Sequence, residues 1–376
     1  MSSMPNARHL LLRALTNPRS LEHLELKEWE LLVRFARASK LLAALGFKLA
    51  KSYLNPIIPP QVQEHFLAAQ KLVEYRQRLV MWELNRINKV VASLDVDILV
   101  LKGGAYMMLD LDMAHGRSVS DIDILVSKND IERLENCLTD YGWQTAKIDA
   151  YDQHYYRTWM HEIPPMRHRD RFVEVDIHHT ILPLTSRLHP DPDRLFKDAV
   201  KVSGYDFKVL SPIDMVLHSA AHLFYDAELT DSDFRDLVDL HELLTLFSED
   251  KPEFLEMLEK RSCELQLQRP LYYTFYFSKN LLNTQIPKKL ITEHSGRPSV
   301  FVRWVMEKLV PVSLLPEHPD YPRKRVALAR WLLYMRSHYL RMPLYLLLPH
   351  LMKKAKKRLE RKDLDELKSQ HQNDDT

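Results

Sequence analysis

Residues 118–126 read Ser-Val-Ser-Asp-Ile-Asp-Ile-Leu-Val, and this stretch decides the predicted fold. Side chains of a β-strand alternate between its two faces, so Asp121 and Asp123 project from one face while the isoleucines project into the core. Two neighbouring carboxylates repel each other unless a cation lies between them or one of them takes a proton. Such a pair suits Mg²⁺, which binds one or two carboxylates and completes its shell with water and substrate phosphates. We therefore expect a site for a metal–nucleotide complex here.

A second strand, predicted at 171–178, supplies a third carboxylate. Its sequence Arg-Phe-Val-Glu-Val-Asp-Ile-His alternates between apolar and polar residues, which places Asp176 and His178 on the polar face. If the two strands are neighbours, Asp176 completes a cluster that can hold two metal ions and stabilise both oxygens of a displacement at phosphorus. We assign Asp121, Asp123 and Asp176 as metal ligands and catalytic residues, and we place His178 in the substrate pocket.

Upstream, Lys102-Gly103-Gly104 follows an apolar run at 97–101, a pattern that predicts a buried strand opening into a turn. Glycines allow a phosphate to approach the backbone closely, and the N-terminus of a following helix favours an anion. Arg117 can neutralise charge on a transferring phosphate. A Gly-Gly turn or an Asp-x-Asp pair alone is common in other proteins, so the prediction depends on their combination. The expected nucleotide-binding residues are Lys102, Gly103, Gly104, Arg117 and Ser120.

These motifs lie in the only stretch of the chain with an alternating strand–helix pattern. Helices are predicted at 105–114 and 129–141, the second ending before Gly142, and further strands at 143–148 and 154–159. The segment 161–170, rich in histidine, arginine and proline, is predicted as a loop that either covers the site or is solvated.

The flanking regions show apolar residues three and four positions apart, as amphipathic helices do. The predicted helices span 21–49, 61–94, 213–224 (after the N-cap Ser211 and Pro212), 234–247 and 251–267. The predicted division is an N-terminal helical region (1–95), an α/β core (96–210), a helical domain (211–310) and a C-terminal segment with a polar tail (311–376). The predicted fold class is α+β, mostly helical, with a small mixed sheet.

On the predicted helix 213–224, His218 and His222 lie four residues apart and share one face. No cysteine and no H-E-x-x-H pattern accompanies them, so we expect hydrogen bonds to Asp239 or Arg235 on the next helix, with a role in the substrate pocket as the alternative. His218, Arg235 and Asp239 are included in the predicted substrate pocket.

The composition is that of an ordinary globular protein, with 45% hydrophobic and 28% charged residues and a net charge of +2. The 7 glycines argue against a turn-rich all-β architecture. Cys137 and Cys263 lie far apart and lack metal-ligand spacing, which indicates a reducing compartment. No signal peptide and no apolar window of ~18 residues is found, so we expect a cytoplasmic protein.

The segment 321–359 contains 11 lysines or arginines and no acidic residue. Aromatic and aliphatic residues lie between the basic ones, a pattern that suits an interfacial helix on anionic lipid. Packing against the body of the protein or a partner is the main alternative, and nucleic-acid binding is the least expected. The sequence thus predicts a peripheral contact with the anionic inner face of a membrane.

The stretches 101–104, 116–126 and 175–178 resemble the uncharacterised nucleotidyltransferase family of the DNA polymerase β-like superfamily. The resemblance extends from about residue 30 to about residue 245, and its downstream part includes Asp214, His218, His222, Arg235 and Asp239 on paired helices. It implies a polymerase β-like core in which the glycine turn holds the phosphates of the nucleotide. It also implies that three acidic residues bind two Mg²⁺ (or Mn²⁺) ions, a role that falls to Asp121, Asp123 and Asp176.

The predicted reaction moves a nucleoside monophosphate from a nucleoside triphosphate to an acceptor and releases pyrophosphate. The acceptor is left open between a small molecule, a sugar and a protein side chain. The alternative is a catalytically silent nucleotidyltransferase fold that serves as a binding or assembly module at a membrane surface. The intact acidic triad argues against this alternative, whereas Ala105, in place of the superfamily's usual serine, argues for it.

Overall fold

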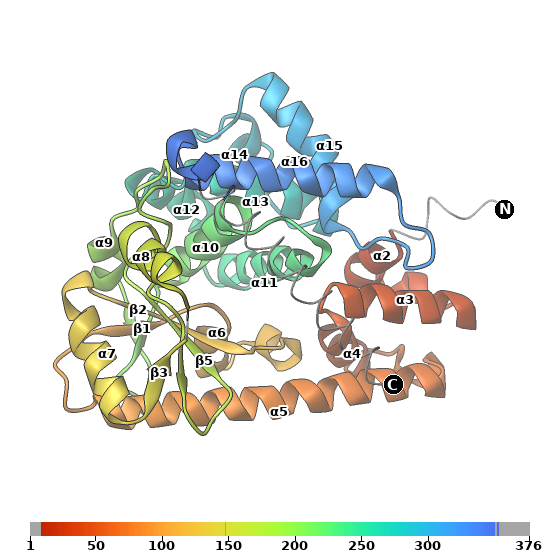
Figure 1. The fold of residues 1–376 in the computed structure, drawn as a ribbon. Helices are drawn as coiled ribbons and strands as arrows, with labels where there is room; N and C mark the ends of the chain where they lie inside the picture. The colour runs from red at the N-terminus through yellow and green to blue at the C-terminus, as the bar shows by residue number, and fades with distance from the viewer. Residues whose placement is uncertain (1–8, 147, 350–351, 353–376) are drawn as a thin grey trace, which may run out of the picture.

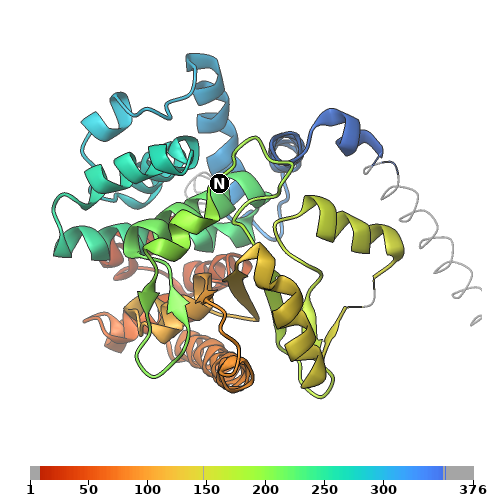
Figure 2. The ribbon, with the colours of Figure 1, turned by 90° about the vertical axis from the view of Figure 1, so that its left-hand side faces the viewer.

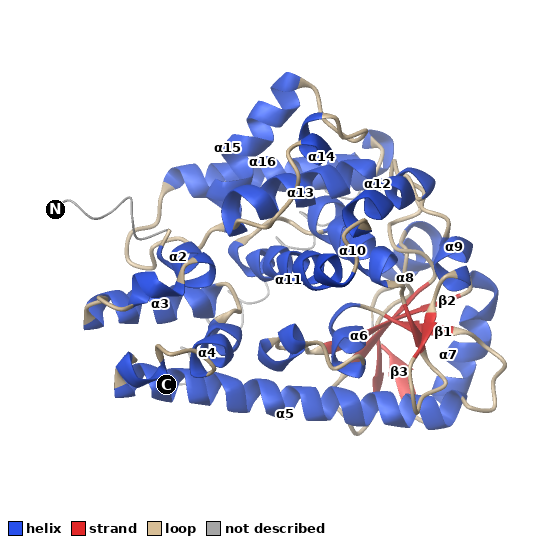
Figure 3. Ribbon diagram, turned by 180° about the vertical axis from the view of Figure 1, so that it is seen from behind, coloured by secondary structure: helices blue, strands red, loops and turns tan. Residues whose placement is uncertain are grey.

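The computed structural model describes residues 9–146, 148–349 and 352. Over these residues the chain is mostly helical and contains one mixed seven-stranded sheet, which confirms the predicted fold class (Figures 1 and 3). The strands are β1 (Ile98–Val100), β2 (Asp121–Val126), β3 (Trp143–Thr145), β4 (Met166–His168), β5 (Glu174–His178), β6 (Val200–Lys201) and β7 (Lys208–Val209).

The strand order is β3-β4-β5-β2-β1-β7-β6, with β2 and β5 adjacent and parallel. Their register pairs Asp121 with Glu174 and Asp123 with Asp176. Strand β1 is antiparallel to β2 and parallel to β7, and the remaining neighbours are antiparallel. The alternation predicted for 118–126 therefore yields a central strand whose acidic face lies beside that of β5.

The N-terminal part consists of helices, as the spacing of its apolar residues predicts. The predicted helix 21–49 divides in two, and the predicted helix 61–94 is one long helix that begins at Pro60. In Figure 1 this helix, α5, runs along the lower edge of the molecule beneath the sheet. The helices of this part are α2 (Leu10–Thr16), η1 (Pro18–Leu21), α3 (Leu26–Ala38), α4 (Leu42–Ala50), η2 (Asn55–Ile57) and α5 (Pro60–Val91).

The stretch predicted as a strand at 154–159 is a helix, so that prediction is wrong. Asp149 caps α8 (Ala150–Trp159), because its Oδ1 accepts hydrogen bonds from the backbone N–H groups of Tyr151 (3.0 Å) and Asp152 (2.9 Å). The predicted loop 161–170 also contains strand β4. The other helices of this region are α6 (Lys102–Met108), η3 (Asp112–Gly116), η4 (Lys128–Asp130), α7 (Ile131–Asp140) and α9 (Pro192–Lys197).

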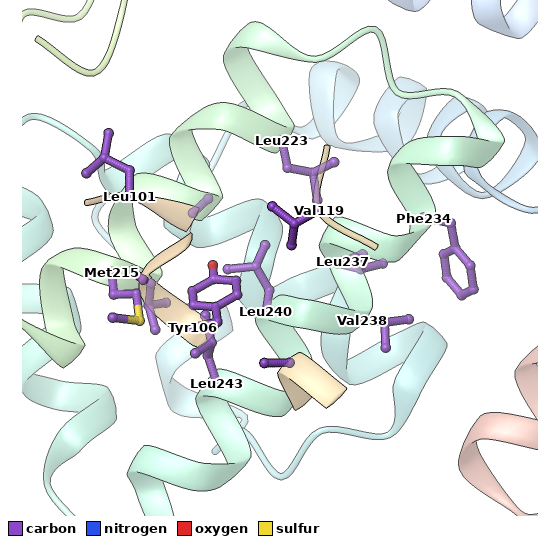
Figure 4. Packing of buried hydrophobic residues seen from close by; sticks show 14 of the residues in the cluster. Leu101, Tyr106, Val119, Met215, Leu223, Phe234, Leu237, Val238, Leu240 and Leu243 are labelled. Carbon is purple, nitrogen blue, oxygen red and sulfur yellow. The ribbon is translucent and has the colours of Figure 1, made fainter. Parts of the chain in front are cut away.

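The C-terminal helices cover α6 and the sheet. Ser211 caps α10, accepting a hydrogen bond from the N–H of Asp214 at 3.2 Å. Figure 4 shows Tyr106 of α6 packed among apolar side chains from two of these helices, including Met215 and Leu240. The helices are α10 (Pro212–Ala221), the π-helical turn η5 (His222–Asp226), η6 (Asp231–Asp233), α11 (Phe234–Asp250), α12 (Phe254–Glu264), α13 (Gln268–Leu282), α14 (Lys289–Thr292), α15 (Val300–Leu314) and α16 (Lys324–Arg341).

The basic C-terminal segment packs on the protein through α16, which contacts α15 and η5. Its Arg336 donates to the carbonyl oxygen of Phe224 (3.0 Å), and Arg341 pairs with Asp226 (3.3 Å). Figure 2 views α5 and α16 nearly end-on, with α10 and α11 between them. The structure thus supports the packing interpretation for this helix, whereas residues 353–359 lie outside the described part of the chain. No helix among the described residues is both long and apolar enough to cross a membrane.

Candidate active site

The three predicted acidic ligands lie on one face of the two central strands. Asp123 and Asp176 are directly opposite each other across β2 and β5, and Asp121 precedes Asp123 by two residues on the same face. The opposite face is buried: Ile122 and Ile177 are fully inaccessible to solvent. The register of β2 and β5 therefore brings together the carboxylates that the sequence predicts as a triad.

Asp123 has two nitrogen partners, one from Lys102 and one from His178. Lys102 Nζ lies 3.0 Å and His178 Nε2 lies 3.1 Å from the same oxygen, Asp123 Oδ1. Burial by itself would raise the pKa of Asp123, but Lys102 and His178 hold that pKa well below its ordinary value. Asp123 is therefore charged, and its charge is compensated in the metal-free protein.

The pKa of Asp176 is shifted in the opposite direction. Burial, together with the negative charges of Asp123, Glu162 and Asp121, raises the pKa of Asp176 to about 7, although the nearby His178 acts in the opposite direction. Negative charge is thus in excess at this edge of β5. A cluster of carboxylates with an excess of negative charge has the donor set that a hard divalent cation requires.

The turn after β1 approaches the triad through Lys102. Lys102 has a φ of +44°, a conformation that non-glycine residues rarely adopt, and it is the first residue of α6. Strain of this kind occurs often at functional sites and persists only where the surrounding structure maintains it. Here the conformation accompanies the hydrogen bond from Lys102 to Asp123, so the lysine predicted to bind phosphate contacts a carboxylate predicted to bind metal.

Gly103 also has a packing role. A Cβ atom at this position would collide with the guanidinium of Arg117 and would lie 2.8 Å from a methyl group of Val119. Glycine is therefore required here to admit the Arg117 side chain. At Gly104, the nearest obstacle to a Cβ is a methyl group of Val100 at 2.7 Å, so this glycine allows α6 to pack against β1.

Arg117 is buried and paired with two carboxylates of α11. Its Nε donates to Asp239 Oδ2 at 2.6 Å, and its Nη2 lies 3.7 Å from Asp236 Oδ1. The guanidinium also lies over the ring of Tyr106, 5.4 Å from its centroid. Two predicted site residues, Arg117 and Asp239, are thus brought together, and Asp239 orients Arg117.

The remaining predicted residues have mixed outcomes. Ser120 Oγ donates to Asp121 Oδ1 at 3.3 Å, and Arg235 Nη1 donates to the carbonyl oxygen of Ser118 at 3.0 Å. Both residues thus hold the segment that leads into β2.

The histidines of α10 and η5 do not pair as predicted. His222 Nδ1 lies 3.7 Å from Asp236 Oδ2, so its partner is Asp236 and not Asp239 or Arg235. His218 is buried, and burial together with nearby Lys102 holds its pKa well below the ordinary value. Asp214 lies outside the pocket, where Arg261 binds both of its oxygens at 2.9 and 3.0 Å.

A cavity of about 180 Å³ opens beside two members of the triad, Asp121 and Asp123. It brings most of the predicted residues together, but His178, His218, Gly104 and Asp176 are not part of its lining. Its lining residues are Lys40, Lys102, Gly103, Tyr106, Arg117, Ser118, Val119, Ser120, Asp121, Asp123, Ser219, His222, Arg235, Asp236 and Asp239. A neighbouring cavity of about 140 Å³ shares Lys40, Arg117, Arg235 and Asp239 with it.

Sequence reasoning missed Lys40, Asp236 and Glu162. Lys40 stands between α3 and α4 with a φ of +55°, far from the motifs in sequence. Asp236 is one residue beyond the predicted Arg235, within the predicted helix 234–247. Glu162 comes next to β5 through the isolated bridge between Glu162 and His178. None of the three belongs to a local motif, so spacing alone could not identify them.

Comparison with known proteins places the chain in a family. The family model described as uncharacterised nucleotidyltransferase matches residues 25–283. Among solved structures, the chain is similar to an antigenic nucleotidyltransferase-like protein from Paracoccidioides brasiliensis, with 12% identity and a TM-score of 0.32, over 58% of this chain and 98% of that chain. This likeness is too weak to support an argument, and no curated protein matches. Because the family model spans most of its length, the chain belongs to the uncharacterised nucleotidyltransferase family.

Proposed function

We propose that this protein transfers a nucleoside monophosphate from a nucleoside triphosphate to an acceptor hydroxyl or phosphate. The observation that carries the proposal is the pairing of Asp123 with Asp176 across β2 and β5, with Asp121 on the same face. Three carboxylates on one open face beside a polar cavity are suited to a displacement at phosphorus in which charge must be neutralised. Membership of the nucleotidyltransferase family supports the same chemistry.

The donor set fits the metal that this chemistry uses. Asp121, Asp123 and Asp176 would hold Mg²⁺ (or Mn²⁺), and the bound cation would neutralise charge on the triphosphate. The pKa of Asp176, raised to about 7 by burial and by neighbouring carboxylates, is the observation that supports this assignment. Of the three carboxylates, Asp176 is the one whose ionised form a bound cation would stabilise most.

The chain's own cations and carboxylates account for the other roles. Lys102 and Arg117 line the cavity and can stabilise negative charge on the phosphates. Asp176 lies beside Asp123 on the acidic face, so it is also the candidate base for the proton of the acceptor. In the proposed step the acceptor oxygen gives its proton to Asp176 and bonds to the α-phosphorus, while the bond from that phosphorus to the departing pyrophosphate breaks.

The neighbouring cavity is the proposed site for the nucleoside or the acceptor. It adjoins the first cavity through Lys40 and Arg235, and its wall includes apolar side chains that can contact a base or a sugar ring. These apolar residues are Leu15, Leu41, Phe47, Met113 and Val238. This arrangement would place the phosphates in the polar cavity and a less polar group beside Phe47.

The testing experiment incubates the protein with each α-labelled nucleoside triphosphate and Mg²⁺, then follows label on the protein itself and on the components of a cell extract. We expect Mg²⁺-dependent transfer with release of pyrophosphate, and no transfer by Asp176→Asn. The variant Asp140→Asn, an exposed carboxylate at the end of α7, is the matched control and should keep the wild-type rate.

A catalytically silent module is the second candidate, and one observation favours it. Both cations expected to hold phosphate are already engaged, Lys102 by Asp123 and Arg117 by Asp239. Absence of label with every triphosphate, combined with calorimetric binding of a triphosphate, would support this candidate. The cytoplasmic location and the membrane contact of 321–359 stay predictions from the sequence.

A further inference from the structure

A cluster of two histidines and a glutamate lies beside the acidic triad and has no role in the proposed transfer. The segment after α8 pairs with the end of β5: the N–H of His179 donates to the carbonyl oxygen of His161 (2.8 Å), and the N–H of Ile163 donates to that of Ile177 (3.0 Å). The bridge between Glu162 and His178 lies within this pairing. As a result the rings of His161 and His178 lie face to face, with centroids 5.1 Å apart and planes at 29°.

The donor atoms of the cluster are spaced as metal ligands and not as hydrogen-bond partners. His178 Nδ1 lies 3.6 Å and His161 Nε2 lies 4.0 Å from the same oxygen, Glu162 Oε2. One ligand atom from each residue can be chosen so that all three lie within 4.8 Å of one another. Hydrogen bonds end near 3.2 Å, whereas two ligands at ~2.0–2.1 Å from one tetrahedral ion lie about 3.4 Å apart. The shortest separation in the cluster, 3.6 Å between His178 Nδ1 and Glu162 Oε2, is close to this ligand–ligand distance.

One buried ring nitrogen of the cluster has no hydrogen-bond partner among the described residues. His161 is buried, and its Nδ1 has no hydrogen-bond partner in the described part of the chain. His178 uses Nε2 for its contact with Asp123 Oδ1 at 3.1 Å. With a proton on Nε2, the lone pair of Nδ1 faces the Glu162 carboxylate, and two acceptors that face each other require a cation or a proton between them.

The contact between His178 and Asp123 is the outer-shell arrangement that metal-binding histidines usually have. A histidine that binds a metal through one nitrogen almost always donates the other N–H to a carboxylate, a carbonyl or water, and this contact fixes its tautomer. Here His178 Nε2 contacts Asp123, while His178 Nδ1 faces Glu162. Buried imidazole donors suit Zn²⁺ and similar ions, whereas Mg²⁺ prefers oxygen ligands.

We propose that His161, Glu162 and His178 bind a divalent transition-metal ion of the Zn²⁺ type, at a site separate from the carboxylate triad. Two histidines and one glutamate form a three-ligand set that leaves a fourth position for water or a substrate oxygen. The ion would fix the ring of His178 and, through it, the carboxylate of Asp123. The site does not depend on the proposed nucleotide transfer, because it is defined by its own three side chains.

The experiment uses Co²⁺ as a spectroscopic substitute for Zn²⁺ in the full-length protein without a histidine tag, after treatment with a chelator. Excess Mg²⁺ is present to occupy the triad. We expect one equivalent of Co²⁺ to bind with the intense visible absorption of a four-coordinate site, and Zn²⁺ to displace it. His161→Gln and Glu162→Gln should weaken Co²⁺ binding at least 10-fold, whereas Asp121→Asn and the exposed His189→Gln should bind as the wild type does.

The outcomes separate this site from the triad and from surface binding. Loss of the cobalt spectrum in Asp121→Asn, or its retention in both His161→Gln and Glu162→Gln, would overturn the proposal. X-ray absorption of the Zn²⁺-loaded wild type needs no variant and should count two imidazole ligands, so a count of none would overturn it even if the variants fail to fold. Failure of nucleotide transfer would leave these results unchanged.

Discussion

Asp123 and Asp176 lie directly opposite each other on parallel strands, yet their environments shift their pKa values in opposite directions. Of these two aspartates, Asp123 is the one that Lys102 and His178 contact, so they compensate its charge, whereas Asp176 has mainly carboxylates as charged neighbours. Pairs of carboxyl groups with divergent pKa values are typical of sites where one group binds a charge and the other exchanges a proton. This difference directs the first prediction to Asp176.

We predict that Asp176→Asn abolishes nucleotide transfer and makes the metal-free protein more stable than the wild type at pH 8. The pKa of Asp176 is about 7 in the folded protein, above the ordinary value of 3.8. Its contribution to stability is therefore fully present at acid pH and is lost as the pH rises through about 7. Asparagine carries no charge and avoids this loss.

The measurement is the melting temperature of both proteins in a chelating buffer between pH 5 and pH 8. The difference, variant minus wild type, should increase over this interval. A difference that is constant with pH would show that Asp176 does not titrate there. Wild-type turnover by the variant would contradict the assignment of Asp176 to the reaction.

Lys102→Ala should weaken the binding of a nucleoside triphosphate more than the binding of Mg²⁺. Lys102 is the cation at the turn after β1 and lines the cavity, where its ammonium can act as a point charge on phosphate. Calorimetric titrations of both ligands give the comparison, and Lys89→Ala, an exposed lysine on α5, is the control. Equal triphosphate affinities in variant and wild type would restrict Lys102 to its contact with Asp123.

Gly103→Ala should destabilise the fold by about 1–3 kcal/mol, the usual cost of overpacking. The added methyl group meets the Arg117 guanidinium and Val119, so Arg117 must move away from Asp239. Helix propensity alone predicts the opposite sign, because alanine exceeds glycine by ~1 kcal/mol within a helix. The free energy of unfolding in urea decides between these two opposite predictions. A stabilised variant would show that the contact with Arg117 is readily relieved.

Glu83→Ala should cost about 3–5 kcal/mol, as expected when one partner of a buried ion pair is removed. Glu83 is fully buried on α5 and accepts hydrogen bonds from Arg171 at 2.6 and 3.1 Å. The control is Glu74→Ala, which removes an exposed pair with Lys71 and should change the free energy of unfolding by under ~1 kcal/mol. Similar effects of the two substitutions in urea unfolding would refute the prediction.

Truncation after Pro322 should lower the melting temperature. It removes the buried Val326 and Leu333 of α16, each worth about 1.5–3 kcal/mol by burial, and the pair between Arg341 and Asp226. Sedimentation with phosphatidylglycerol vesicles at low and high salt tests the membrane prediction with the same two proteins. An unchanged melting temperature, with salt-sensitive sedimentation of the full-length form alone, would favour membrane attachment over packing.

The sequence predicted β2 and β5 well because each alternates cleanly between apolar and acidic residues, so their register follows once they are neighbours. The prediction failed at 154–159. The segment His-Tyr-Tyr-Arg-Thr-Trp contains aromatic residues typical of strands, but Asp149 caps a helix that includes it. The propensity of six residues is weaker evidence than a period sustained over a whole element.

Contacts between distant segments could not be predicted. Arg117 is paired with Asp239 on α11, and Lys102 with Asp123 rather than with an expected phosphate. The sequence also could not decide whether α16 packs on the protein or on a membrane, because a basic and apolar helix fits a lipid surface and a protein surface alike. Local spacing specifies which side chains share a face, but the packing of helices decides which charges meet.

The position of Arg341 at the end of α16 affects the order in which charged groups become available during synthesis on the ribosome. Burial opposes ionisation of its partner Asp226, but neighbouring basic groups, Arg341 and Lys102 among them, lower the pKa of Asp226 to about 2. At 5–20 residues per second, translation from Asp226 to Arg341 takes roughly 6–23 s. During that interval the nascent chain holds Asp226 without its guanidinium. Asp226 therefore acquires the charge of its guanidinium partner only after α16 has been synthesised.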